Sequence, residues 1–184
     1  MVTFADRLSG SDIRSIGNVD SVISDIKNKH DFDQLFLLLH SSDRVIAMHA
    51  ADAIEKITRV HPGYLEGHEQ AVATITLHAA SKELQWHMVL LVPRITLYKE
   101  DQHAVIFKII AWAKDKEQSK IVRVNALQAL YELTMKDVYS KHALKKLLQH
   151  IEQENIPSLN ARIKKIVHLL PECKGGGDCS CCAL

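Results

Sequence analysis

The chain has little of the residues that usually signal a particular chemistry. Only 5% of its 184 residues are aromatic, and 23 basic against 22 acidic residues leave a net charge of +1. Bulk electrostatics will not draw such a chain to nucleic acid or anionic lipid. No apolar run reaches the roughly 20 residues of a membrane span, and the first residues, MVTFADRLSGSD, lack the apolar core of a secretory signal. We therefore expect a cytoplasmic protein.

Cysteine is absent until residue 173, and all four cysteines lie in the final stretch CKGGGDCSCCAL. A cysteine-free body fits a reducing compartment, and a chain of this size buries roughly 70% of its unfolded surface without staples. Pro171 and the three glycines at 175–177 predict a flexible tail over residues 172–184. The thiolates of these four cysteines could hold tetrahedral Zn²⁺ or Cu(I), although paired C-x2-C spacing is missing. The candidate ligands are Cys173, Cys179, Cys181 and Cys182.

Two further interpretations of the tail stay open. Its cysteines could cycle between thiol and disulfide, which would make it a redox sensor. The last four residues, CCAL, also fit a C-a-a-X prenylation motif at Cys181, but no polybasic second signal precedes them. A tail without a dedicated role is the simplest expectation.

The body repeats itself with a period of 38 residues. Thr58, Thr96 and Thr134 close three similar stretches and are spaced by that interval. The stretches are VIAMHAADAIEKIT (45–58), ELQWHMVLLVPRIT (83–96) and IVRVNALQALYELT (121–134). A fourth copy, PSLNARIKKIVHLL (157–170), fits at a spacing of 35.

Each copy reads as a helix, because its apolar residues recur at i, i+4, i+7, i+8 and i+11. Another helix is expected before each copy, at about 31–40, 64–79, 100–116 and 137–152. Pro93 should kink the second of the repeated helices near Val89. Paired helices at this period predict an all-α chain, an α-α superhelix of the HEAT or armadillo type with about four helix pairs and an N-terminal capping unit.

The expected repeat domain covers residues 1–171. It divides into a partial cap and four repeats: 12–30, 31–61, 62–98, 99–136 and 137–171. Three segments, AADAIEKITRVHPGYL (50–65), QWHMVLLVPRITL (85–97) and IVRVNALQALYEL (121–133), resemble a group of small bacterial HEAT-repeat proteins of undefined function. The resemblance implies an ARM-type superhelix in a bacterial cytosol, and it transfers no catalytic motif.

Rows of residues along the second helices should face the concave side of such a solenoid. The predicted partner-binding residues on these rows are Asp52, Lys56, Trp86, Arg94, Gln128, Tyr131 and Glu132. Trp, Tyr and Arg are enriched among the anchors of protein interfaces, which favours Trp86, Arg94 and Tyr131. The alternative is that Trp86 packs between repeats and Arg94 pairs with Asp52 or Glu132.

Two less favoured hypotheses concern the body of the chain. His49 and His87 occupy equivalent repeat positions and could approach a metal, but a complete ligand set is not evident. Trp86, Trp112 and Asp52 could serve a HEAT-like nucleic-acid enzyme, but the basic residues are scattered among acids. We therefore expect no catalysis. The expected function is a scaffold that binds a partner protein or peptide, and the alternative is a metal- or redox-responsive protein that uses the cysteine tail.

Overall fold

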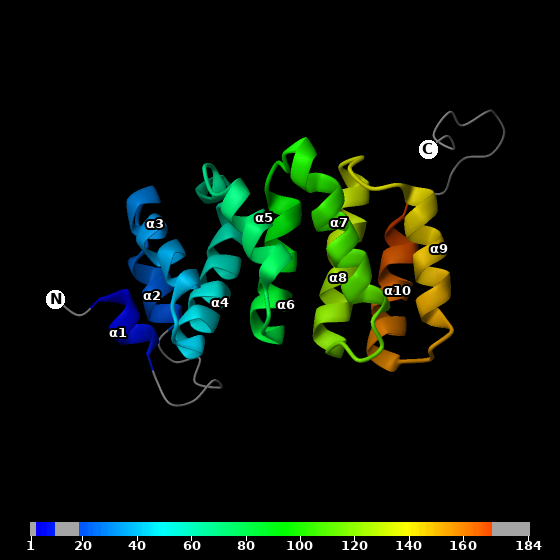
Figure 1. The fold of residues 1–184 in the computed structure, drawn as a ribbon, viewed down its shortest axis with the longest axis horizontal. Coiled ribbons are helices and arrows are strands. Elements are labelled where there is room, and N and C mark those ends of the chain that lie inside the picture. The colour runs from blue at the N-terminus through cyan, green and yellow to red at the C-terminus, as the bar shows by residue number, and fades with distance from the viewer. Residues whose placement is uncertain (1–2, 10–18, 171–184) are drawn as a thin grey trace. The chain divides into compact units, whose positions relative to one another are not determined.

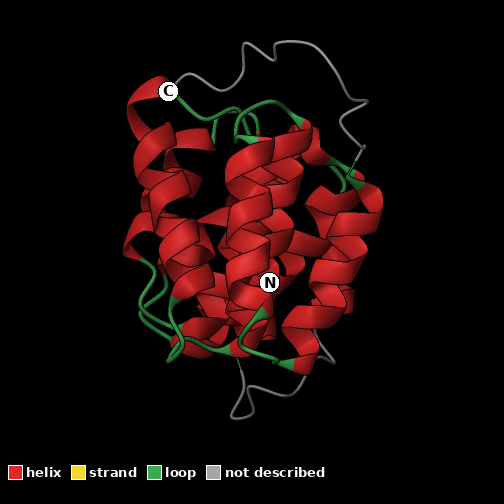
Figure 2. Cartoon of the chain, turned by 90° about the vertical axis from the view of Figure 1, so that its right-hand side faces the viewer, coloured by secondary structure: helices red, strands yellow, loops and turns green. Residues whose placement is uncertain are grey.

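A computed structural model describes residues 3–9 and 19–170 of the chain, and all regular structure in these two ranges is helical (Figure 2). No strand occurs within them. The expected all-α fold class is therefore confirmed. No helix in the described part is long and apolar enough to cross a membrane.

The chain divides into two compact units, Met1–Val105 and Ile106–Leu184, which we call unit 1 and unit 2. Figure 1 labels the α-helices in chain order. Unit 1 holds α1 (Phe4–Leu8), α2 (Val19–Asp25), α3 (Lys29–Leu37), α4 (Arg44–Val60), α5 (Glu69–His78) and α6 (Lys82–Leu91). Helix α7 (Lys99–Lys114) crosses the boundary, and unit 2 continues with α8 (Lys120–Met135), α9 (Lys141–Glu152) and α10 (Pro157–Leu169).

Three short 3-10 turns complete the description, all of them in unit 1. They are η1 (Leu38–His40), η2 (Pro62–Leu65) and η3 (Val92–Arg94). The helices α4, α6, α8 and α10 match the four sequence copies, and α3, α5, α7 and α9 are their preceding partners. Of the expected cap, α2 is described and residues 10–18 lie outside the described part.

Side-chain caps explain where several helices begin. The Asp43 carboxylate accepts hydrogen bonds from the backbone N–H groups of Val45, at 2.8 Å, and Ile46, at 3.4 Å. The Ser81 hydroxyl accepts from the Leu84 N–H, and Asn28 starts α3 in the same way. Such caps satisfy N–H groups that the first helical turn leaves without a partner. Asn155, with φ of 54°, forms the left-handed turn between α9 and α10.

The core lies where helices that are adjacent or next but one in the chain meet within each unit. In unit 1, α4 packs against α2, α3 and α6; in unit 2, α8 packs against α9 and α10. The small residues Ala50 and Ala53 of α4, and Ala126 and Ala129 of α8, are all completely buried. Helices thus pack against their sequence neighbours, which is the packing order of an α-α superhelix.

Pro93 ends its helix instead of kinking it, so the expected kink near Val89 is replaced by a helix end. Helix α6 stops at Leu91, and Pro93 lies in the following 3-10 turn. Proline has no N–H with which to continue the α-helical hydrogen bonds. Consequently Thr96 is exposed, whereas its repeat equivalents Thr58 and Thr134 are buried and donate to the carbonyls four residues earlier.

A completely enclosed arginine ties the elements of unit 2 together. Arg123 on α8 is 1% exposed. Its Nε donates to the Ala113 carbonyl of α7 and its guanidinium reaches Glu154 in the turn after α9, both at 2.9 Å. The hydrogen bond from Arg123 holds the pKa of the Glu154 carboxyl below its ordinary value. One side chain therefore joins three segments of the unit.

We expect Arg123→Ala to lower the free energy of unfolding of unit 2 by roughly 3 kcal/mol, because it strands a carboxylate and leaves a cavity. Arg123→Met, which keeps most of the volume, should cost less. Urea unfolding followed by Trp112 fluorescence in a Trp86→Phe background measures this directly. Arg162→Ala is the control, because among the described residues that half-buried arginine makes one side-chain hydrogen bond, to Gln128. Equal losses for Arg123→Ala and Arg162→Ala would contradict the expectation.

Candidate functional site

All seven residues predicted to bind a partner are half-buried in the structure. Four belong to unit 1, where Asp52 and Lys56 lie on α4, Trp86 on α6 and Arg94 in η3. Three belong to unit 2 and lie on α8: Gln128, Tyr131 and Glu132. None of the seven side chains is buried in the core, and none is fully exposed. Intermediate exposure of this kind is typical of ordered side chains at a surface.

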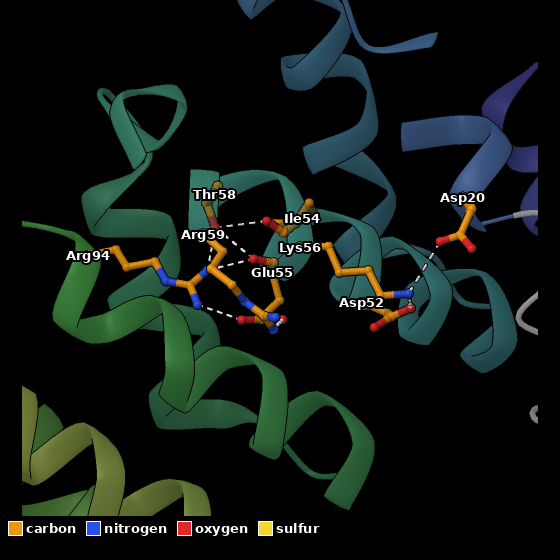
Figure 3. A network of polar contacts seen from close by, with 8 residues as sticks. All are labelled: Asp20, Asp52, Ile54, Glu55, Lys56, Thr58, Arg59 and Arg94. Carbon is orange, nitrogen blue, oxygen red and sulfur yellow. Dashed lines mark hydrogen bonds and ion pairs between the residues drawn. The ribbon is translucent and has the colours of Figure 1, made fainter. Parts of the chain in front are cut away.

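In unit 1, Lys56 holds two carboxylates on neighbouring helices. Its Nζ lies 2.9 Å from Asp52, one turn earlier on α4, and 3.5 Å from Asp20 on α2 (Figure 3). Burial alone would lower the pKa of Lys56, but the two carboxylates outweigh it and raise that pKa. Because Asp20 is largely exposed, this contact orients the side chains more than it stabilises the fold.

Arg94 clamps α4 rather than projecting from the surface. Its guanidinium donates to the Glu55 carboxylate, to the Glu55 backbone carbonyl at 2.6 Å and to the Thr58 hydroxyl at 2.8 Å (Figure 3). Arg59 donates to the other carboxylate oxygen of Glu55. Burial raises the pKa of Glu55, but hydrogen bonds from Arg94 and Arg59 outweigh it and the pKa lies below its usual value.

Glu55 is the residue of this network that the sequence analysis missed. We considered Asp52 and Glu132 as partners of Arg94, and the partner is Glu55, which is only 4% exposed. A usable signal exists, because Glu55 and Arg94 lie 39 residues apart, one more than the repeat period. Arg44 and Glu83 form a second ion pair at the same separation.

The neighbour of Trp86 is an unusual buried histidine. The Trp86 and His87 rings meet edge to face with centroids 5.3 Å apart. His87 is 7% exposed, and its Nδ1 has no hydrogen-bond partner within the described residues. Burial lowers the pKa of His87 to about 4, although Asp52 and Glu55 act to raise it. His87 is therefore neutral at physiological pH.

In unit 2 the predicted residues form a polar chain between two second helices. The Gln128 amide donates to Glu132 one turn later on α8, and its oxygen accepts from Arg162 on α10, both at 2.7 Å. Tyr131 lies beside them on α8 and is half-buried. Because these hydrogen bonds fix Gln128 and Glu132, both side chains are already ordered.

The residues considered for metal binding are not assembled into a site within residues 3–9 and 19–170. No group of three or more His, Cys, Asp or Glu side chains there could hold an ion. The Nδ1 of His49 lies 2.8 Å from the Leu8 carbonyl, so this ring is held by α1. The tail cysteines Cys173, Cys179, Cys181 and Cys182 lie outside the described residues.

Of the residues considered for a nucleic-acid enzyme, Trp112 is not placed to stack on a base. Trp112 is only 5% exposed and lies under the ammonium group of Lys108, 5.7 Å from its ring centroid. A buried indole cannot stack on a base. Asp52 is occupied by Lys56.

Comparisons with known proteins add no identity. No protein-family model, no curated protein and no solved structure matches the chain. The case for function therefore depends on the side chains.

The low pKa of His87 predicts an acid-labile fold. Since the folded pKa of about 4 lies below the ordinary 6.5, the unfolded chain binds the extra proton between these values. The contribution of neutral His87 to the free energy of unfolding is complete above about pH 6.5. It is lost as the pH falls toward 4, by on the order of 3 kcal/mol. Urea unfolding at several pH values should show this slope in the native chain. It should flatten in His87→Leu and persist in His103→Leu, a change at an exposed site. An unchanged slope in His87→Leu would refute the assignment.

Proposed function

We propose that the chain is a non-catalytic, HEAT-like scaffold that binds a partner protein on the second helices of its repeats, the face that we expect to be concave. The observation that supports this is the uniform half-burial of the seven predicted residues. They are too exposed for a core, and polar contacts order five of them: Asp52, Lys56, Arg94, Gln128 and Glu132.

The polar contacts support binding because they order the surface before a partner arrives. Ordering a long side chain at an interface costs about 0.5–1.5 kcal/mol, and the ion pairs of Lys56 and Arg94 have already met that cost. Trp86 and Tyr131 supply partly exposed aromatic area, one in each unit. Aromatic residues surrounded by fixed polar groups are the usual composition of interface hot spots.

The contribution of Arg94 differs from that of the other residues. Because Arg94 neutralises the buried Glu55, replacing it should unfold the local structure as well as disturb the surface. Lys56 and Tyr131 are better probes of binding, since both side chains are half-buried and the carboxylates paired with Lys56 are themselves partly exposed.

A paired substitution tests the proposal. Lys56→Ala together with Tyr131→Ala should reduce quantitative capture of a partner from lysate of the source organism at least tenfold, because each change removes a side chain from the proposed second-helix face of its own unit. The melting temperature and helical circular dichroism should stay close to native. The control pair, Lys27→Ala with Tyr98→Ala, removes one lysine and one tyrosine from outside that surface. Unchanged capture by the Lys56/Tyr131 variant would sink the proposal, and so would equal loss in both variants.

A further inference from the structure

The near-neutral net charge of the chain is the sum of opposite charges on its two units. Residues 1–105 contain 10 Lys and Arg against 14 Asp and Glu, whereas residues 106–184 contain 13 against 8. Unit 1 therefore carries −4 and unit 2 carries +5. Helix α9 contributes strongly, with Lys141, Lys145 and Lys146 against the single acid Glu152.

Part of this charge surrounds a cavity between two first helices of unit 2. The cavity measures about 350 Å³, and α7, α9 and the turn before α9 line it with Ile110, Lys114, Tyr139, Ala143, Lys146, Leu147 and His150. Ile110, Ala143 and Leu147 give it apolar walls. Lys114, Lys146 and His150 are exposed at its edge, and its lining includes no Asp or Glu.

The two lysines of the cavity are not committed to any carboxylate within the described residues. Lys114 and Lys146 take part in none of the ion pairs of residues 3–9 and 19–170. His150 interacts electrostatically with Glu154, but that carboxylate is held by Arg123 and does not line the cavity. This cationic edge differs from the surface of unit 1, where Lys56 and Arg94 are already neutralised.

An exposed aromatic side chain stands next to the cavity along α7. Phe107 is 74% exposed and lies one helical turn before Ile110, so α7 presents Phe107, Ile110 and Lys114 at i, i+3 and i+7. An exposed phenylalanine leaves apolar area in water, and a partner could bury that area. The α7–α9 groove, meaning the cavity together with Phe107, thus combines apolar area with positive charge.

We propose that the α7–α9 groove binds an acidic peptide segment of a partner protein. One hydrophobic side chain of the segment fills the cavity against Ile110 and Leu147, and flanking Asp or Glu carboxylates pair with Lys114 and Lys146. The Tyr139 hydroxyl, whose pKa is raised by burial, stays protonated and donates a hydrogen bond to the bound segment. The site lies on first helices and is separate from the second-helix surface proposed above.

The apolar walls favour a peptide over a nucleic acid. Phosphates would use the lysines but would gain nothing from Ile110, Ala143, Leu147 or Phe107. A hydrophobic residue flanked by carboxylates uses both the charge and the cavity. A second copy of this chain could supply acidic groups from its unit 1, and the test below separates that outcome.

Fluorescence anisotropy on the full chain at about 0.15 M salt provides the test, since charges beyond about 8 Å are screened there. The probes are labelled nine-residue peptides with a central Leu, Phe or Trp flanked by Asp and Glu, and matched peptides with Asn and Gln in place of the acids. We expect the acidic peptides to bind at least tenfold more tightly than the neutral ones. Lys114→Glu with Lys146→Glu should abolish that preference, and Phe107→Ser should weaken binding several-fold.

The control pair is Lys164→Glu with Lys165→Glu, which makes the same charge change on exposed α10 residues that do not line the cavity. It should change the affinity less than twofold. Equal weakening by both pairs would overturn the proposal, because diffuse charge would then suffice. Tighter binding of a single-stranded DNA 12-mer, lost in Lys114→Glu/Lys146→Glu, would reassign the groove to nucleic acid. A concentration-dependent dimer in sedimentation, lost in the same variant, would reassign it to a second copy. Absence of peptide binding would also overturn it, and none of these results bears on the Lys56/Tyr131 test.

Discussion

The side chains Ala50 and Ala53 of α4, and Ala126 and Ala129 of α8, are small and completely buried, so they take up little room between these helices and their neighbours. The helices that pack on them include α6 against α4 in unit 1 and α10 against α8 in unit 2. Burial of these apolar stripes supplies the main driving force, because a single helix pair cannot cover its own apolar face. The polar contacts depend on the same spacing, since hydrogen bonds between helices form only when the backbones are held within reach.

Three polar contacts in unit 1 share the same separation along the sequence. The Arg44–Glu83 and Glu55–Arg94 ion pairs and the Lys29–His68 contact each join residues 39 apart, one more than the period of 38. Glu55 and Glu83 are nearly inaccessible to solvent, so a shift of one residue in packing would leave buried carboxylates without partners. In unit 2 the Gln128–Arg162 bond spans 34 residues, one fewer than the spacing of 35 for the last copy, so the offset of unit 1 does not extend to it. Packing these helices in another register would therefore cost the free energy of burying an unpaired carboxylate.

The sequence predicts the helices well because their signals are local. The 38-residue period and the apolar spacing within each copy place all four second helices. The partner of Arg94 could not be chosen, because the one-residue offset between helices is a property of packing. The end of α6 was also missed, since Pro93 is compatible with either a kink or a stop. The α7–α9 groove was not predicted, because the net charge was summed over the whole chain and the opposite charges of the two units nearly cancel in that sum.

The opposite signs of the two units also bear on how the protein behaves in concentrated solution. With −4 on one unit and +5 on the other, two molecules attract each other when unlike units meet, while the small net charge provides little repulsion. Salt screens this attraction. Solubility near neutral pH should therefore rise between low and moderate ionic strength, which favours purification and storage in buffered saline over dialysis into water.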